Sequence, residues 1–142
     1  NIMKLDLKIE LKEVSENDII FLYDLLEKRN PEENISHTHM PNFEGHREFV
    51  LSKPYTNWYI IKKNGEKVGS IYLSKRDEIG VSILDSFEFD EIKKSSFKLL
   101  MELNPRKRYL ANVSPKNKIS QKFLEKNGFV GLEYVYELKN NG

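Results

Sequence analysis

The chain has three histidines, His37, His39 and His46, which lie within one short stretch. Histidine is the side chain whose ordinary pKa lies closest to neutral pH. His37 and His39 are two residues apart, so in an extended segment their side chains share one face. Three interpretations remain open: a polar surface loop, a site that recognises a substrate or takes its proton, and a metal site. The metal site is the weakest, because the set lacks a clear carboxylate partner, and we expect no metal.

Two carboxylates mark the ends of a predicted strand over residues 78–84. Glu78 begins this strand and Asp85 follows it. A carboxylate held at a strand end can serve as a general base. The structural interpretations are a solvated strand end for Glu78 and a turn or helix cap for Asp85. We retain Glu78, with His37 and His39, as a candidate catalytic residue.

The composition excludes other chemistries. The 142 residues include no cysteine, which removes disulfides, thiolate metal sites and cysteine nucleophiles. With 23 basic and 22 acidic residues, no excess charge favours nucleic acid or a membrane surface as partner. No apolar run approaches the roughly 20 residues of a membrane span, and the N-terminus lacks the pattern of a signal peptide. We therefore expect a single cytoplasmic domain over 1–142.

The N-terminal elements follow from hydrophobic periodicity. Residues 7–14 alternate apolar and charged, which predicts a half-buried strand. Ser15 and Asp18 have the spacing of a helix cap, and the predicted helix covers 16–28. Pro31 disfavours a helical residue before it, so the helix ends there.

A polar loop over 30–41 leads to a short predicted helix over 43–51. We expect His46 to be partly exposed on this helix. The residues expected to face inward are Phe43, Phe49 and Val50.

Three strands follow, over 56–62, 67–73 and 78–84. The first is aromatic and β-branched, and we expect Trp58 to pack in the core. Asn64–Gly65 between the first two is the strongest short hairpin signal.

The C-terminal half alternates helix and strand. Helices are predicted over 89–103 and 117–126, with a buried strand over 109–113 between them. Gly128 ends the last helix, and residues 129–138 are expected to form one or two closing strands. The expected inward stripe of the first helix is Phe89, Ile92, Ser96, Leu99 and Leu103.

The last helix carries a motif. From Asn117 to Phe129 the sequence reads NKISQKFLEKNGF. This resembles the pattern Asn-x-x-Ala/Ser-x-x-Phe/Leu-Tyr-x-x-x-Gly-Phe of the GNAT family of N-acetyltransferases, and the element order agrees over nearly the whole chain. The resemblance implies an α/β fold with a central mixed, mostly antiparallel twisted sheet of six to seven strands. Helices then cover both faces, and strands four and five splay apart.

The resemblance also implies a binding mode for acetyl-coenzyme A as cosubstrate. The pantetheine arm lies between strands four and five and bonds to free backbone groups of strand four. The pyrophosphate lies on amides at the N-terminus of the following helix, where the helix dipole favours anions. The cofactor-binding residues that the resemblance implies here are Ile83, Leu84, Asp85, Glu91, Lys93, Lys94, Ser95, Ser96 and Asn117.

The pyrophosphate loop departs from the family pattern Gln/Arg-x-x-Gly-x-Gly/Ala. Its positions fall on Glu91, Lys94 and Ser96, and no glycine lies between Gly80 and Gly128. The Glu91 carboxylate repels a phosphate, whereas the lysines and serines of 93–96 attract one. We expect weakened or altered coenzyme A binding.

A second departure concerns the proton donor to the departing thiolate. Many members of the family place a tyrosine where this chain has Leu124. Tyr109, Tyr134 and Tyr136 are the substitutes considered, together with solvent.

The expected function is transfer of acetyl from acetyl-coenzyme A to a primary amine of a small molecule, with an inclination to an amino sugar or sugar nucleotide. The deprotonated amine attacks the thioester directly, and amides of strand four polarise its carbonyl. The rival hypothesis is a binding or regulatory module of the same fold with weak or lost transfer. We expect a monomer or homodimer.

Overall fold

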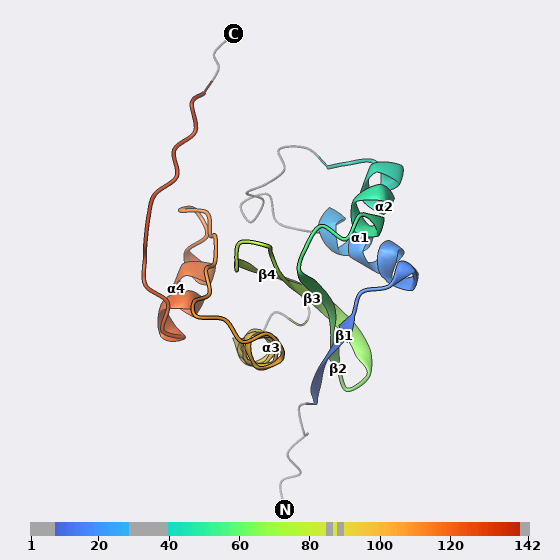
Figure 1. Ribbon diagram of the computed structural model, residues 1–142, viewed down its shortest axis with the longest axis horizontal. Helices are drawn as coiled ribbons and strands as arrows, with labels where there is room; N and C mark the ends of the chain where they lie inside the picture. The colour runs from blue at the N-terminus through green and yellow to red at the C-terminus, as the bar shows by residue number, and fades with distance from the viewer. Residues whose placement is uncertain (1–7, 29–39, 85–86, 88–89, 140–142) are drawn as a thin grey trace, which may run out of the picture.

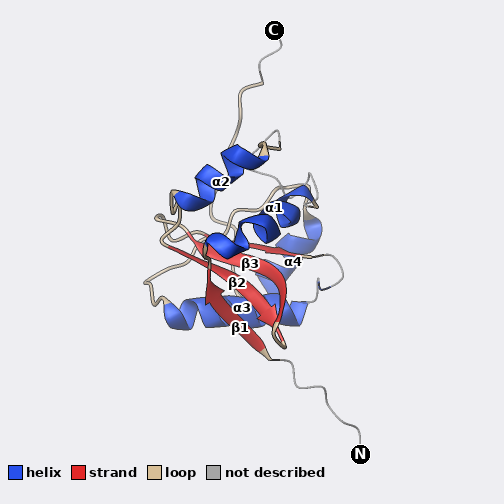
Figure 2. Ribbon diagram, turned by 90° about the vertical axis from the view of Figure 1, so that its right-hand side faces the viewer, coloured by secondary structure: helices blue, strands red, loops and turns tan. Residues whose placement is uncertain are grey.

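The sheet of this protein has four antiparallel strands in the order β1-β2-β3-β4 (Figure 2). The computed structural model describes residues 8–28, 40–84, 87 and 90–139. The strands are β1 (Ile9–Glu13), β2 (Asn57–Lys63), β3 (Glu66–Leu73) and β4 (Ile79–Ile83). The four strands predicted over 7–14, 56–62, 67–73 and 78–84 are confirmed within two residues at either end.

Tight turns hold consecutive strands in register. Asn64 and Gly65 both have positive φ, 49° and 86°, which is the backbone of the two-residue turn that matches strand twist. The predicted hairpin is therefore confirmed. A register shift between Ile61 and Lys62 interrupts the pairing of β2 with β3 just before this turn.

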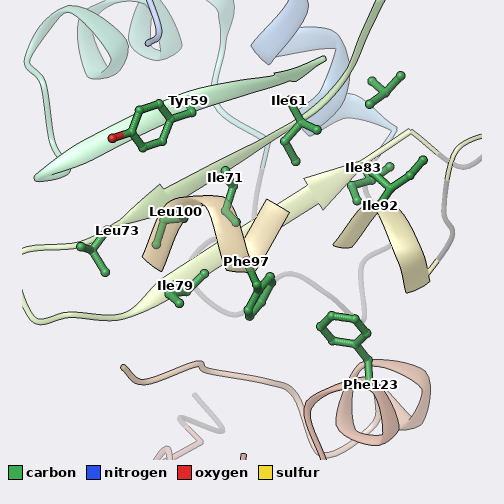
Figure 3. Packing of buried hydrophobic residues seen from close by; sticks show 11 residues of the cluster. Tyr59, Ile61, Ile71, Leu73, Ile79, Ile83, Ile92, Phe97, Leu100 and Phe123 are labelled. Atoms are coloured by element: carbon green, nitrogen blue, oxygen red, sulfur yellow. The ribbon is translucent and has the colours of Figure 1, made fainter. Parts of the chain in front are cut away.

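The helix α3 (Asp90–Leu103) covers one face of the sheet (Figure 1). Its buried side chains include Ile92, Phe97 and Leu100, which pack on the strands with Phe123 of α4 (Lys118–Lys126). Figure 3 shows Phe97 and Phe123 facing one another, with ring centres 5.4 Å apart. Of the predicted stripe, Ile92 and Ser96 are buried, but Leu103 is 57% exposed because it lies at the end of the helix.

The opposite face is covered by α1 (Ile19–Glu27) and α2 (Phe43–Leu51), with a 3-10 turn at Glu16–Asp18 before α1. Figure 2 shows these helices on the side of the sheet away from α3. The second hydrophobic cluster there consists of Ile19, Leu22, Val50 and Ile60, with Trp58 packed against it. Trp58 thus belongs to the smaller cluster, and its neighbour Tyr59 belongs to the main core.

Two expectations for α2 are wrong. Phe43 and Phe49 are 38% and 37% exposed, and only Val50 of the predicted set is buried. The two rings lie at the flanks of the helix, against Tyr23 and Tyr55. His46 is 5% exposed instead of lying at the surface, because α2 presents it to α1.

The C-terminal part of the sheet differs from the prediction. Residue Leu110 makes one isolated parallel bridge with Glu78, and 109–113 forms no longer ladder among the described residues. Residues 129–139 form no strand. The described sheet thus has four strands, not six to seven, because neither segment is paired along its length. No helix in the described part of the chain is long and apolar enough to cross a bilayer.

Candidate functional site

One edge of β4 has no partner beyond its first residue among the described residues. The Ile79 amide donates to the Leu110 carbonyl at 2.7 Å, and the Leu110 amide donates to Asp77 at 2.9 Å. Backbone groups of alternate strand residues point to the same edge, so those of Val81 and Ile83 face the same side as those of Ile79. β4 is the last strand of the described sheet. Its outer amides and carbonyls are therefore placed to bond to an extended ligand.

This edge leads toward the start of α3. The amide of Leu84 donates to Val68 at 2.9 Å, which keeps the end of β4 attached to β3. Ile83 is buried beneath it. The α3 helix begins at Asp90, and the first-turn amides of a helix have no partner within the helix. Such amides, with the helix dipole, attract an anion. Asp85 lies outside the described residues.

The side chains predicted to hold the cofactor differ in how they are placed. Glu91 and Lys94 are exposed, and Ser95 is half-buried. Lys93 is buried, and its ammonium lies 5.6 Å from the centre of the Phe123 ring. Ser96 is fully buried, and its hydroxyl donates to the Ile92 carbonyl at 2.7 Å. The Ser96 hydroxyl is thus engaged inside its own helix.

Asn117 caps α4. Its side-chain oxygen accepts a hydrogen bond from the Ser120 amide at 3.1 Å, and its own amide donates to Ser114 at 2.9 Å. This is the standard use of asparagine at a helix N-terminus. The motif residue therefore has a structural role of its own in the described chain.

Glu78 lies where β4 and the segment 109–113 meet. One carboxylate oxygen accepts from the Ser74 hydroxyl at 3.0 Å, and the other accepts from the Asn112 side-chain amide at 2.6 Å. The residue is half-buried. Hydrogen bonds from two segments hold this carboxylate at the bridged end of the β4 edge.

Of the three histidines only His46 lies in the described part of the chain, where it packs against α1 and not beside Glu78. His37 and His39 lie outside the described residues. His46 packs against Tyr23 of α1, with ring centres 5.2 Å apart, and its Nε2 has no hydrogen-bond partner in the described structure. Burial lowers the pKa of His46, and a hydrogen bond with the Ile19 backbone opposes this effect. Among the described residues no group of three or more His, Asp or Glu is arranged to hold a metal.

An aromatic pair that the sequence reasoning missed lies beside β4. The Tyr72 ring lies over Gly80, so close that a Cβ at this glycine would meet the ring at 2.2 Å. Tyr55 stacks on Tyr72, with ring centres 3.8 Å apart and planes 2° apart. Both rings belong to the face covered by α2, because Tyr55 also contacts Phe49 and Trp58. The hairpin register sets Gly80 opposite Tyr72 and so leaves room for the Tyr72 ring, but no sequence signal places Tyr55 on it.

Of the three tyrosines considered as proton donors, Tyr109 is engaged elsewhere. Its hydroxyl lies 2.7 Å from the Asn104 carbonyl and accepts from the Arg106 amide at 3.0 Å. Tyr134 and Tyr136 are 88% and 89% exposed. Tyr109 therefore ties the end of α3 to the next segment.

Solved structures of acetyltransferases share this fold. RimL, a ribosomal alpha-N-protein acetyltransferase in complex with coenzyme A, matches with a TM-score of 0.69 and 19% identity, over 85% of this chain and 79% of that one. An aminoglycoside N-acetyltransferase, AAC(6')-Iy, also in complex with coenzyme A, matches with a TM-score of 0.68 and 16% identity, over 99% and 100%. A domain from Methanocaldococcus jannaschii matches with a TM-score of 0.72 and 23% identity, over 93% and 94%.

The sequence itself matches neither a family model nor a curated protein. The chain thus has the fold of GNAT acetyltransferases, an α/β fold with helices on both faces of an antiparallel sheet, as expected.

Proposed function

We propose that this protein transfers acetyl from acetyl-coenzyme A to a primary amine. The observation that carries the proposal is the edge of β4 that has no described partner beyond Ile79. Its far end lies near the first turn of α3, since Ile83 of β4 and Ile92 of α3 belong to one core cluster (Figure 3). An extended amide-containing arm fits such an edge as an added strand, and a pyrophosphate fits a helix N-terminus. The coenzyme A held by RimL and by the aminoglycoside acetyltransferase supports the same ligand here.

The direction of β4 determines which residues meet the reacting atoms. From Ile83 to Glu78 a strand extends about 17 Å, at roughly 3.4 Å per residue. When the phosphates are held at the α3 end of this edge, the thioester at the other end of the pantetheine arm lies in the direction of Glu78. The β4 amide nearest the carbonyl then stabilises the oxyanion, and Glu78 accepts the proton of the attacking amine. As the C–N bond forms, the C–S bond of the thioester breaks, and the departing coenzyme A thiolate takes a proton from solvent.

For the acceptor we propose a small-molecule primary amine, with an amino sugar or sugar nucleotide as the first class to test. The Tyr55–Tyr72 pair beside Gly80 supplies aromatic surface next to β4 on the α2 side. Aromatic rings attract ammonium groups and pack on the apolar faces of sugars. The relatives of known activity differ in acceptor: RimL acts on a protein and AAC(6')-Iy on an aminoglycoside.

One observation favours the rival proposal, a binding or regulatory module with weak or lost transfer. The first turn of α3 carries the carboxylates of Asp90 and Glu91, which compete with a phosphate for the positive end of the helix. The buried hydroxyl of Ser96 cannot assist the phosphate.

Coenzyme A binding separates these proposals when it is measured by calorimetry and by thermal shift, because a ligand specific for the folded state raises the melting temperature. We expect Val81→Pro to weaken binding at least tenfold while leaving the fold intact, since the amide it removes faces away from β3. Ser82→Pro removes a β3–β4 bond instead, and we expect this control to unfold more easily. If wild-type protein gives no shift with millimolar acetyl-coenzyme A, the enzyme proposal is wrong.

With binding established, an amine panel assayed for coenzyme A release distinguishes the two functions. Turnover with an amino sugar and not with peptide N-termini supports the proposed acceptor. Tight binding without turnover of any amine supports the module.

A further inference from the structure

The C-terminal arm, residues 130–139, has the sequence pattern of a strand but contacts little of its own subunit. Its even-numbered residues form one apolar row, with the other face mostly polar. Such alternation is typical of a strand buried on one side. The row consists of Val130, Leu132, Tyr134, Tyr136 and Leu138, which are 84%, 64%, 88%, 89% and 90% exposed.

The arm is directed away from the body at its first residue. Phe129 remains packed in the core, with its ring 6.0 Å from Phe97, whereas Val130 is already exposed. In Figures 1 and 2 the arm runs past the helices, and its end lies clear of them. A row of large apolar side chains in water is unfavourable, so it needs a surface that covers it.

The segment 109–113 of the same chain has an edge that no backbone hydrogen bond occupies among the described residues. Leu110 points its amide and carbonyl to β4, so the backbone groups of its neighbours Ala111 and Val113 point to the opposite edge. Within the described residues no backbone hydrogen bond reaches Ala111 or Val113. An open edge of this kind is a template for a strand from another chain.

We infer that two copies of this chain exchange their C-terminal arms, each arm adding a strand to the 109–113 edge of the other copy. Because both copies carry the same arm and the same edge, one two-fold axis satisfies both at once and the assembly closes as a dimer. The two tyrosines of each arm alone bury roughly 300–500 Å² when covered. Two arms with their leucines therefore approach the total of about 1,600 Å² that is usual for a stable interface.

Because the arm is exposed in the single subunit, substitutions in it test dimer formation without affecting the subunit core. Tyr136 and Val135 are neighbours on opposite faces and are 89% and 87% exposed, so Glu at either position does not disturb the subunit core. We expect light scattering to find a dimer for the wild-type chain and for Val135→Glu. For Tyr136→Glu we expect a dimer dissociation constant about a hundredfold higher or more, because both arms lose a buried ring. A wild-type monomer, or an unchanged dimer of Tyr136→Glu, overturns the inference.

Crosslinking tests which edge receives the arm. The chain has no cysteine, so single-cysteine variants give unambiguous disulfides. An Ala111→Cys chain is refolded together with single-cysteine variants across residues 131–137, one at a time. We expect a disulfide between the two different chains at one or two neighbouring arm positions, and none with the control Glu27→Cys on α1. A further chain carries Ala111→Cys and an arm cysteine together. If a disulfide forms only within this chain and never between the single-cysteine chains, the arm closes on its own subunit and exchange is excluded. If no arm position reacts, the edge assignment is wrong.

Discussion

The side-chain amide of Asn112 donates to the Glu78 carboxylate at 2.6 Å and thereby joins the segment 109–113 to the start of β4. The hydroxyl of Ser74 holds the other oxygen of the same carboxylate. These bonds fix the orientation of Glu78 at the bridged end of the free β4 edge, where the proposed reaction requires a proton acceptor.

Glu78→Gln tests that role. The amide keeps the size of the side chain but cannot accept the amine proton, so we expect kcat to fall about a hundredfold, within the usual range for a general base. The affinity for coenzyme A, measured by calorimetry, should stay the same. Asn112→Ala is the matched variant, which removes only the bond that orients the carboxylate, and we expect a smaller loss. A Glu78→Gln enzyme with full activity excludes Glu78 as the base.

Glu91→Gln tests the charge at the start of α3. Glu91 is exposed in the first turn, where a bound pyrophosphate competes with its charge. Removal of the charge is expected to tighten coenzyme A binding two- to fivefold, equivalent to about 0.3–1 kcal/mol at a helix terminus. Glu102→Gln, at the other end of the same helix, is the control and should leave the affinity unchanged. Equal effects of the two variants mean that no phosphate binds at this helix.

Variants of Asn117 test whether this residue only caps α4 or also contributes to coenzyme A binding. Asn117→Ala should cost about 1 kcal/mol in urea unfolding, because the Ser120 amide loses its acceptor. Asn117→Ser restores a capping oxygen and should recover most of this stability. We also predict weaker coenzyme A binding for the Ala variant. If both variants keep the wild-type affinity, Asn117 only caps its helix.

Asp18 makes stability depend on acid pH. Burial by itself raises the pKa of Asp18, but hydrogen bonds from Lys67, from the Ser15 amide and from Lys12 outweigh it and lower the pKa to about 2. The carboxylate is more acidic in the folded state than its ordinary 3.8, so its contribution is complete above about pH 4 and is lost as the pH falls to about 2.

Asp18→Asn should therefore be less stable than wild type by about 2 kcal/mol at pH 7. In urea unfolding the difference should shrink toward pH 2. The exposed neighbour Glu16 provides the control, since Glu16→Gln should change little at either pH. A difference that stays constant from pH 7 to pH 2 contradicts the assigned charge interaction.

His46 makes stability depend on pH in a higher range than Asp18 does. Burial lowers its pKa below 6.5, so the unfolded chain takes up a proton at this residue before the folded chain does. Stability from this group is complete above pH 6.5 and falls as the pH drops below that value. We expect His46→Phe to lose this part of the pH dependence between pH 7.5 and 5, as measured by urea midpoints. His37→Asn and His39→Asn should retain it, and if either abolishes it the source is not His46.

The sequence by itself determined the local elements of this protein. Alternation in β1, the Asn64–Gly65 turn, the Ser15–Asp18 cap and the Gly128 stop all depend on interactions between residues close in the chain, and all were confirmed. Such patterns can be read from the sequence without knowledge of the fold, because backbone geometry and hydrophobic periodicity depend on neighbouring residues.

Only the tertiary structure decided which faces and edges are covered. It buried His46 between helices, placed Tyr55 on Tyr72, engaged the Ser96 hydroxyl inside α3 and joined Glu78 to Asn112. It also left the arm unpaired, although its alternation predicted a closing strand. Periodicity states that one face of a segment must be buried, but the partner that buries it lies far along the chain or on another copy.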